Sequence, residues 1–167
     1  PDGASHSLSL APYVEWKPAS NVSVSLGPSL DHAVQDAMYV TKVAAPGEVP
    51  ADFGDQRYVF ARLDQTEIAA RIRLNVSFTP NLSLQTFVQP LISAGTYTDF
   101  KELARSRSYD FVHYGQTPGT SYADGVVTPA NGGTPFELGD PDFNFKSLRG
   151  NAVLRWEYRP GSVLYVA

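Results

Sequence analysis

Hydrophobic and polar residues alternate with period two in several stretches of this sequence. The clearest stretch is 68–78, where Ile68, Ala70, Ile72, Leu74, Val76 and Phe78 would share one face, and Ala69, Arg71, Arg73, Asn75 and Ser77 the other. Successive side chains of a β-strand point to opposite faces of its sheet, whereas a helix would spread both arginines around its circumference. The pattern therefore predicts a strand.

The same alternation recurs in 7–16, 22–30, 82–92 and 148–158, and a sixth strand is expected to begin at Val163. Short segments at 17–21, 79–81 and 159–162 contain Pro with Asn or Gly and are typical of hairpin turns. Other connections are longer, above all a Gly-, Pro-, Asp- and Tyr-rich loop at about 101–145. We predict an all-β antiparallel meander of about six strands, forming part of a β-barrel or an open or sandwiched sheet.

Three prolines, Pro12, Pro28 and Pro90, fall inside the predicted strands. Proline cannot donate a backbone hydrogen bond, so within sheets it is confined to edges and bulges. Either the sheet has bulges at these positions, or some strands are shorter than their alternation suggests.

Composition limits the domain count and the partners. A length of 167 residues suits a single β domain over 1–167 or a barrel fragment. The net charge of −4 argues against a nucleic-acid partner, and the lack of cysteine excludes disulfides and thiolate chemistry. Because the chain opens Pro1-Asp2-Gly3 without an initiator Met, we expect a trimmed piece of a longer chain or a larger assembly.

The turns and the polar face favour a membrane barrel over a water-soluble sandwich. Short turns alternate with long loops, as in outer-membrane barrels. The predicted polar face carries Ser, Asn and Gln with Arg71, Arg73, Arg149 and Arg155, which suits a hydrogen-bonded lumen and a preference for anionic solutes. Large aromatic residues near the short turns suit either an interfacial girdle or the closed end of a soluble core: Trp16, Phe78, Trp156 and Tyr158.

Two sequence blocks resemble a bacterial barrel family. The first comprises FTPNLSLQ (78–85), FVQPLISAG (87–95) and YTDFKEL (97–103), and the second is DFNFKSLRGNAVLRWEYRPGS (142–162). They resemble the carboxy-terminal portion of large envelope proteins of uncharacterised function, which carry an amino-terminal domain similar to family-nine carbohydrate-binding modules. The resemblance implies an outer-membrane β-barrel and carries over no catalytic residue. Because six strands cannot close even an eight-stranded barrel, we expect a partner at the open edges.

The long loop is the expected partner-contact region. Its aromatic side chains could form a docking or sugar-stacking surface, or fold the loop onto the mouth of the barrel: Tyr109, Phe111, Tyr114, Tyr122 and Phe136. At its end, Asp140, Asp142 and Asn144 alternate as calcium ligands do, but no glycine or bidentate Glu follows at the required spacing, which favours an Asx-rich turn. No other cofactor is indicated.

The candidate functions follow from these patterns. No Gly-x-Ser-x-Gly or His-Glu-x-x-His motif occurs, so we expect no enzyme. The expected function is a non-catalytic segment of an outer-membrane-type barrel, acting in envelope binding or transport, with membrane or membrane-protein neighbours. The alternative is a β-rich accessory subunit on the periplasmic side of a larger membrane complex, photosynthetic or respiratory for example. A glycan-processing enzyme is a third class, suggested only by the module in similar proteins.

Overall fold

The structure, a computed structural model that describes residues 4–167, is built from β-strands. Strands hold 69% of the residues, and the described part contains no α-helix, only the short 3-10 helices η1 (Ala51–Phe53) and η2 (Ala130–Gly132). No helix in residues 4–167 is long and apolar enough to cross a membrane. The predicted all-β antiparallel fold is confirmed.

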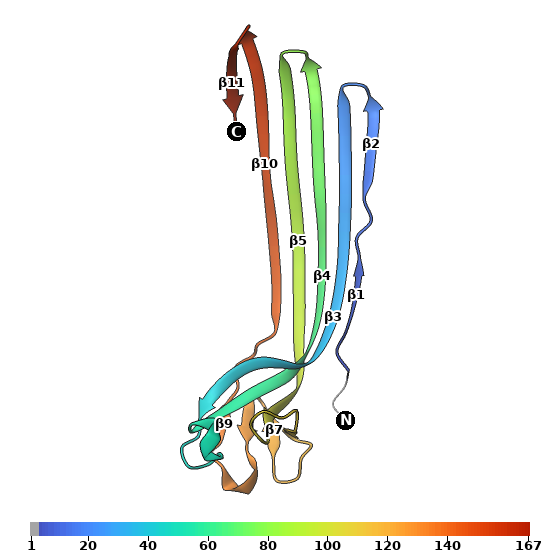
Figure 1. Ribbon diagram of the computed structural model, residues 1–167. Helices are drawn as coiled ribbons and strands as arrows, with labels where there is room; N and C mark the ends of the chain where they lie inside the picture. Colours follow the sequence, from blue (N-terminus) through green and yellow to red (C-terminus); the bar gives the residue numbers. More distant parts are fainter. Residues whose placement is uncertain (1–3) are drawn as a thin grey trace. The chain divides into compact units, whose positions relative to one another are not determined.

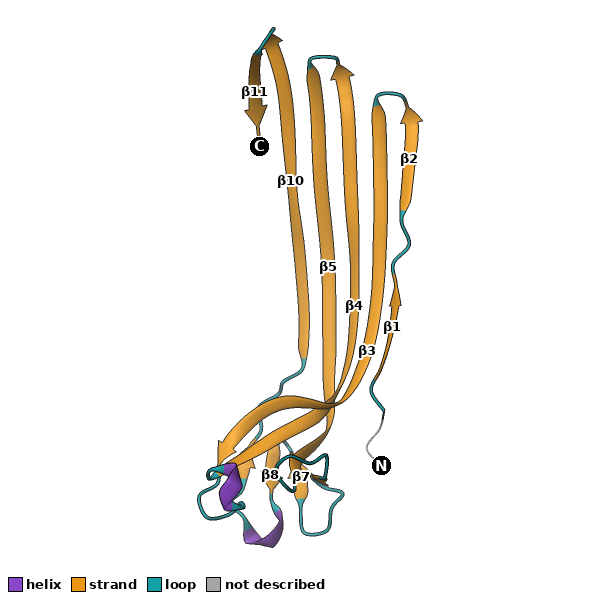
Figure 2. Ribbon diagram, in the orientation of Figure 1, coloured by secondary structure: helices purple, strands orange, loops and turns teal. Residues whose placement is uncertain are grey.

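Eleven strands follow one another in residues 4–167. Figures 1 and 2 show their arrangement. The strands are β1 (His6–Leu10), β2 (Val14–Ala19), β3 (Val22–Ala44), β4 (Gln56–Thr79), β5 (Leu82–Leu103), β6 (Phe111–His113), β7 (Ser121–Ala123), β8 (Val126–Thr128), β9 (Phe136–Glu137), β10 (Phe143–Arg159) and β11 (Ser162–Val166). The larger sheet has the order β1-β3-β4-β5-β10-β11, with β2 also paired to β3 and β6 to β5. Strands β7, β8 and β9 form a second sheet.

The chain divides into two compact units, where the sequence suggested a single domain. Within the described residues, unit 1 comprises 4–6, 33–65 and 95–143, and unit 2 comprises 7–32, 66–94 and 144–167. Strands β3, β4 and β5 each supply residues to both units. Unit 1 was not predicted because the segments that build its core are far apart in the sequence.

Unit 2 contains the strands and turns that the alternation predicted. Two residues separate the strands in each of its three hairpins: Ser20-Asn21, Pro80-Asn81 and Pro160-Gly161. Gly161 has a φ of +77°, which glycine adopts without steric cost. Figure 1 shows the three turns at the same end of these strands, as the meander requires.

The pairing register gives unit 2 an apolar and a polar face. Val14 lies opposite Leu26, whereas the next residue, Glu15, lies opposite Ser25. The same separation holds in the last hairpin, where Trp156 lies opposite Leu164. Arg71 and Ile72 are successive residues of β4 and therefore point to opposite faces, as predicted.

The prolines affect the sheet in two ways. Pro12 separates β1 from β2, so the first predicted strand is two short strands. Pro28 and Pro90 lie within β3 and β5. The pairing register also shifts between Trp16 and Ala19 and between Glu157 and Arg159, so the strand pairing is irregular near two of the turns.

The larger sheet does not close into a barrel within residues 4–167. Strands β1 and β2 form one edge, and β11 forms the other. Strand β11 pairs with β10 only over residues 154–159 of β10. An open sheet edge presents unpaired backbone donors and acceptors, which water or another strand must satisfy.

Unit 1 has the buried core. Side chains from β4, β5, β8 and their connections pack together in it: Val59, Ala61, Phe100, Tyr114, Val127 and Leu138.

The stretch 101–145 is not the one long loop that the sequence suggested. Residues 101–103 end β5, and β6 to β9 lie within the stretch. Strands of two or three residues are too short to produce a detectable alternation, so the sequence showed only their Gly, Pro and Asp residues.

Gly95 is where unit 1 packs most closely around a backbone position. A Cβ atom at Gly95 would lie 2.5 Å from Cε1 of Phe143 and 2.9 Å from Cδ1 of Leu63. Both distances are shorter than van der Waals contact, so only glycine lets the Phe143 ring lie against β5.

We predict that Gly95→Ala lowers the free energy of unfolding by about 1–3 kcal/mol, because the added methyl group overpacks the core. Adding Phe143→Leu should recover part of the loss, because the smaller side chain makes room. Urea denaturation of the variants and the double mutant measures both effects. Gly139→Ala is the control, since its Cβ would meet no atom within 4 Å. Equal losses for Gly95→Ala and Gly139→Ala would contradict the packing argument.

Candidate functional site

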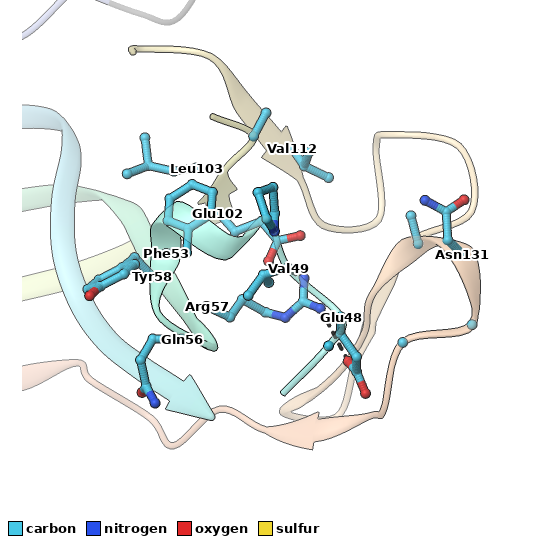
Figure 3. Close-up of a pocket in the computed structure, with 16 residues that line it drawn as sticks. Glu48, Val49, Phe53, Gln56, Arg57, Tyr58, Glu102, Leu103, Val112 and Asn131 are labelled. Atoms are coloured by element: carbon cyan, nitrogen blue, oxygen red, sulfur yellow. Dashed lines mark hydrogen bonds and ion pairs between the residues drawn. The ribbon is translucent and has the colours of Figure 1, made fainter. Parts of the chain in front are cut away.

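Unit 1 contains a cleft of about 450 Å³. Its wall combines apolar side chains, including Phe53, Val49 and Leu103, with charged and amide side chains (Figure 3). A volume of this size is in the range of small-molecule sites. We refer to this space as the unit 1 cleft.

Strand pairing places two charged residues at the cleft. Arg57 is the second residue of β4 and lies on the same strand face as Val59 and Ala61, so it is buried with them. Glu102 precedes the last residue of β5 and is also buried. Glu48 reaches the cleft from the connection between β3 and η1.

Arg57 joins the two carboxylates. Its Nη1 donates to Oε2 of Glu102, and its Nη2 lies 3.4 Å from Oε2 of Glu48. Figure 3 shows Arg57 between the two glutamates. Burial opposes the charge of Arg57, but the hydrogen bond and the charge of Glu102 outweigh it, so the pKa of Arg57 lies above its usual value. A guanidinium group held by two carboxylates stays charged in a buried position.

Tyr114 extends this network into the core. Its hydroxyl group donates to Oε2 of Glu102 over 3.1 Å. Burial first, and then the negative charge of Glu102, raise the pKa of Tyr114 well above its usual value. The phenol therefore remains a hydrogen-bond donor at every physiological pH.

Glu48 links the cleft to the connection between β8 and β9. Both of its carboxylate oxygens accept hydrogen bonds from the backbone N–H of Thr134, at 3.1 and 3.0 Å, and Oε1 also accepts one from the Thr134 hydroxyl. These bonds, aided by the charge of Arg57, hold the pKa of Glu48 below its usual value. Glu48 thus remains ionised and fixes this connection to the cleft.

A second charged cluster surrounds Lys101, the residue before Glu102. Lys101 is fully buried, with Nζ 3.0 Å from Asp36 and 3.5 Å from Asp99, and 5.0 Å from the centre of the Phe111 ring. Asp99 also accepts hydrogen bonds from His113 at 2.8 Å and Gln116 at 2.9 Å. Buried charges arranged in this way fix how β3, β5 and β6 pack.

The four predicted lumen arginines lie in unit 2, where Arg71 and Arg73 share one face of β4, and Arg149 and Arg155 share one face of β10. Arg73 and Asn75 of β4 line one hollow with Asn151 and Val153 of β10, which indicates that these are the same face of the sheet. Arg71 and Arg73 line a cleft of about 270 Å³ with Tyr13 and Ser25. Arg73 also lies over the Phe87 ring, 5.4 Å from its centre. On β10, Arg155 pairs with Glu157 at 3.2 Å. Arg149 lies on the same face and is exposed.

The predicted contact aromatics mostly pack inside unit 1. Tyr114 is 5% exposed and packs on Phe136, with ring centres 6.1 Å apart. Phe111 packs on Phe60 and Tyr122 on Phe100. Tyr109, by contrast, is 86% exposed, and Tyr122 is 40% exposed although its ring packs on Phe100. Tyr114 is therefore a core residue and cannot contact a partner in this structure, because β5 and β9 cover it.

Two of the three residues of the calcium prediction, Asp140 and Asp142, form a turn. The Asp142 N–H donates to Oδ1 of Asp140 over 3.0 Å, which is an Asx turn, and the Tyr97 N–H donates to Oδ1 of Asp142 over 2.6 Å. Asn144 belongs to unit 2, whereas both aspartates belong to unit 1. Among residues 4–167, no three His, Asp or Glu side chains gather as a metal site.

Sequence reasoning missed the unit 1 cleft. Arg57 stands in a stretch with apolar residues on both strand faces, so alternation is weak there. Arg57 directly precedes the short apolar run 58–61, so a charge beside apolar sequence was the one usable signal. Glu102 stands between Lys101 and Leu103 and carries no such signal. The pairing of Arg57 with Glu102 across 45 positions depends on the fold and has no local signature.

Comparisons of this chain with known protein families, with curated proteins and with solved structures gave no match. The resemblance to the bacterial barrel family therefore stays a prediction.

We predict that unit 1 loses stability at acidic pH because Glu48 becomes protonated. Because the pKa of Glu48 is lower in the folded chain, its contribution is present above the usual glutamate pKa of about 4.5 and is lost as the pH falls further. Urea denaturation between neutral pH and a pH of about 3 measures this effect. As the pH falls, the free energy of unfolding should decrease less steeply for Glu48→Gln than for the unmodified protein. Glu137→Gln, an exposed glutamate on β9, is the control and should keep the full slope. Identical slopes for Glu48→Gln and the unmodified protein would refute this role.

Proposed function

We propose that unit 2 forms part of the wall of an outer-membrane-type β-barrel, and that the protein acts in envelope binding or transport without catalysis. The observation that carries the proposal is the exposed apolar face of unit 2. Large apolar side chains on this face are open to the surroundings: Leu8, Leu10, Val14, Trp16, Leu26, Leu30, Ile68, Phe78, Ile92, Leu148, Trp156, Tyr158, Leu164 and Val166.

Such a face needs an apolar neighbour. Soluble monomers rarely expose contiguous apolar patches beyond a few hundred Å². Leu148 is 74% exposed and Trp16 is 63% exposed, and they belong to strands at either side of the sheet. A hydrocarbon layer would cover this face on all seven strands at once: β1, β2, β3, β4, β5, β10 and β11.

Strand length supports a membrane position. Unit 2 holds residues 22–32 of β3, 66–79 of β4, 82–94 of β5 and 144–159 of β10. A tilted strand crosses the hydrocarbon core with about 9–11 residues. Each of these segments is long enough.

The aromatic residues support the same position. Trp16, Phe78 and Trp156 lie on the apolar face, within a few residues of the two-residue turns. The Trp156 and Tyr158 rings pack edge to face, with centres 6.0 Å apart. Aromatic girdles of barrels occupy the membrane–water interface in this manner.

The open edges favour additional strands. In hydrocarbon, an unpaired backbone group costs several kcal/mol, so spanning sheets close. Further strands should therefore pair with β1 and β2 on one side and with β10 and β11 on the other. The alternative function, an accessory subunit of a membrane complex, is supported by the same edges and apolar face if neighbouring proteins cover them.

Tryptophan fluorescence separates the two functions, because Trp16 and Trp156 are the chain's two tryptophans and share the apolar face. We expect lipids brominated near the head group to quench both strongly in liposomes of the intact protein, and lipids brominated at the chain end to quench them less. The fluorescence of each tryptophan is obtained as the difference between the unmodified protein and the variant that lacks it, Trp16→Phe or Trp156→Phe. In the variant Ser25→Trp, the added side chain lies on the polar face and should escape quenching. Unquenched native tryptophans would exclude the barrel and favour the accessory subunit.

The arginines of the polar face would set a preference for anions, because guanidinium groups lining a pore attract negative solutes. We predict that replacing Arg71, Arg73, Arg149 and Arg155 by Gln shifts the reversal potential of the intact protein in planar bilayers toward cation selectivity. Replacing Arg105 and Arg107 by Gln, two arginines of unit 1, is the control. An unchanged reversal potential in the fourfold variant would contradict the lumen assignment.

A further inference from the structure

The unit 1 cleft has one negative charge more than it has positive charges. Among the described residues that line it, Glu48, Arg57 and Glu102 carry charged side chains. Arg57 uses one terminal nitrogen on each carboxylate. Its positive charge is therefore already balanced within the wall, and an anionic ligand would face a net negative surface.

Glu102 offers a hydrogen-bond acceptor to this cleft. Its Oε2 accepts from both Arg57 and Tyr114. Its Oε1 takes no hydrogen bond from the described residues, and no fully buried side-chain oxygen in that part of the chain lacks a partner. Oε1 therefore keeps some accessible surface, and Glu102 is one of the residues that line the cleft, although Glu102 as a whole is only 8% exposed.

The apolar part of the wall suits a cation with a short apolar body. Phe53 and Tyr58 stand side by side, with ring centres 6.1 Å apart. Aromatic faces attract ammonium and guanidinium groups within about 6 Å. Val49, Leu103 and Val112 add aliphatic surface to the wall.

We propose that the unit 1 cleft binds an organic cation, with the ammonium or guanidinium group at Glu102 and Glu48 and the alkyl part against Tyr58. Its source is either a free amine or a Lys or Arg side chain of a peptide, which share this chemistry. A neutral hydroxyl ligand could also donate to Oε1, but it would leave the extra carboxylate charge uncompensated under its apolar surface. The proposal does not depend on the membrane position of unit 2.

Three probes of matched shape test the charge. Isothermal titration of the intact protein with n-butylammonium, n-butanol and butyrate should show saturable binding of n-butylammonium alone. The peptide Gly-Lys-Gly then separates the two sources, and Gly-Gly-Gly, which lacks a cationic side chain, is its control. Tighter binding of Gly-Lys-Gly than of n-butylammonium identifies a peptide side chain as the source. Weaker binding identifies a free amine.

Variants locate the binding. Glu48→Gln removes the excess charge and should weaken n-butylammonium binding roughly tenfold. Glu137→Gln makes the same charge change away from the cleft and should have no effect. Tyr58→Leu should weaken binding, whereas Tyr58→Phe should keep it, because phenylalanine retains the aromatic face.

Two results would overturn the proposal. The first is binding of n-butanol or butyrate as tight as that of n-butylammonium. The second is an equal loss in Glu48→Gln and Glu137→Gln, which would indicate general attraction to an acidic protein. Glu102→Gln tests the acceptor directly, and Glu48→Gln decides the matter if Glu102→Gln fails to fold.

Discussion

The structure depends on one constraint: a paired strand sends successive side chains to opposite faces, so each face must suit the medium it meets. In unit 2, β4 places Ile72 on the apolar face and Arg71 and Arg73 on the polar face. In unit 1 the same strand buries Arg57 beside Val59. The two units thus share strands but differ in what covers them.

Strand β5 illustrates the energetic consequence. Its consecutive residues Lys101 and Glu102 point to opposite faces, and both are buried. Isolated buried charges cost several kcal/mol each, so both faces must supply counter-charges. Asp36 and Asp99 do so for Lys101, and Arg57 does so for Glu102. Removing one partner would leave a buried charge uncompensated.

The sequence was informative where alternation was strong. The strands of unit 2, their two-residue turns and the shared face of Arg71 and Arg73 could be predicted, because period two and Pro, Asn and Gly are local signals. Unit 1 could not be predicted, because its second sheet has strands of two or three residues and its core joins Val59 to Val127. The burial of Tyr114 could not be predicted for the same reason, because burial by distant strands leaves no trace around the residue itself.

The arginines show how context decides what one residue type can do. Arg57 is bonded at both terminal nitrogens to carboxylates, so its charge holds the cleft wall together and attracts nothing further. Arg71 and Arg149 are exposed on the polar face of unit 2, where their donors remain accessible to water. A charge attracts solutes only when it is not already balanced nearby. The proposed anion preference therefore rests on the polar face, and the proposed cation binding rests on the additional carboxylate of the cleft.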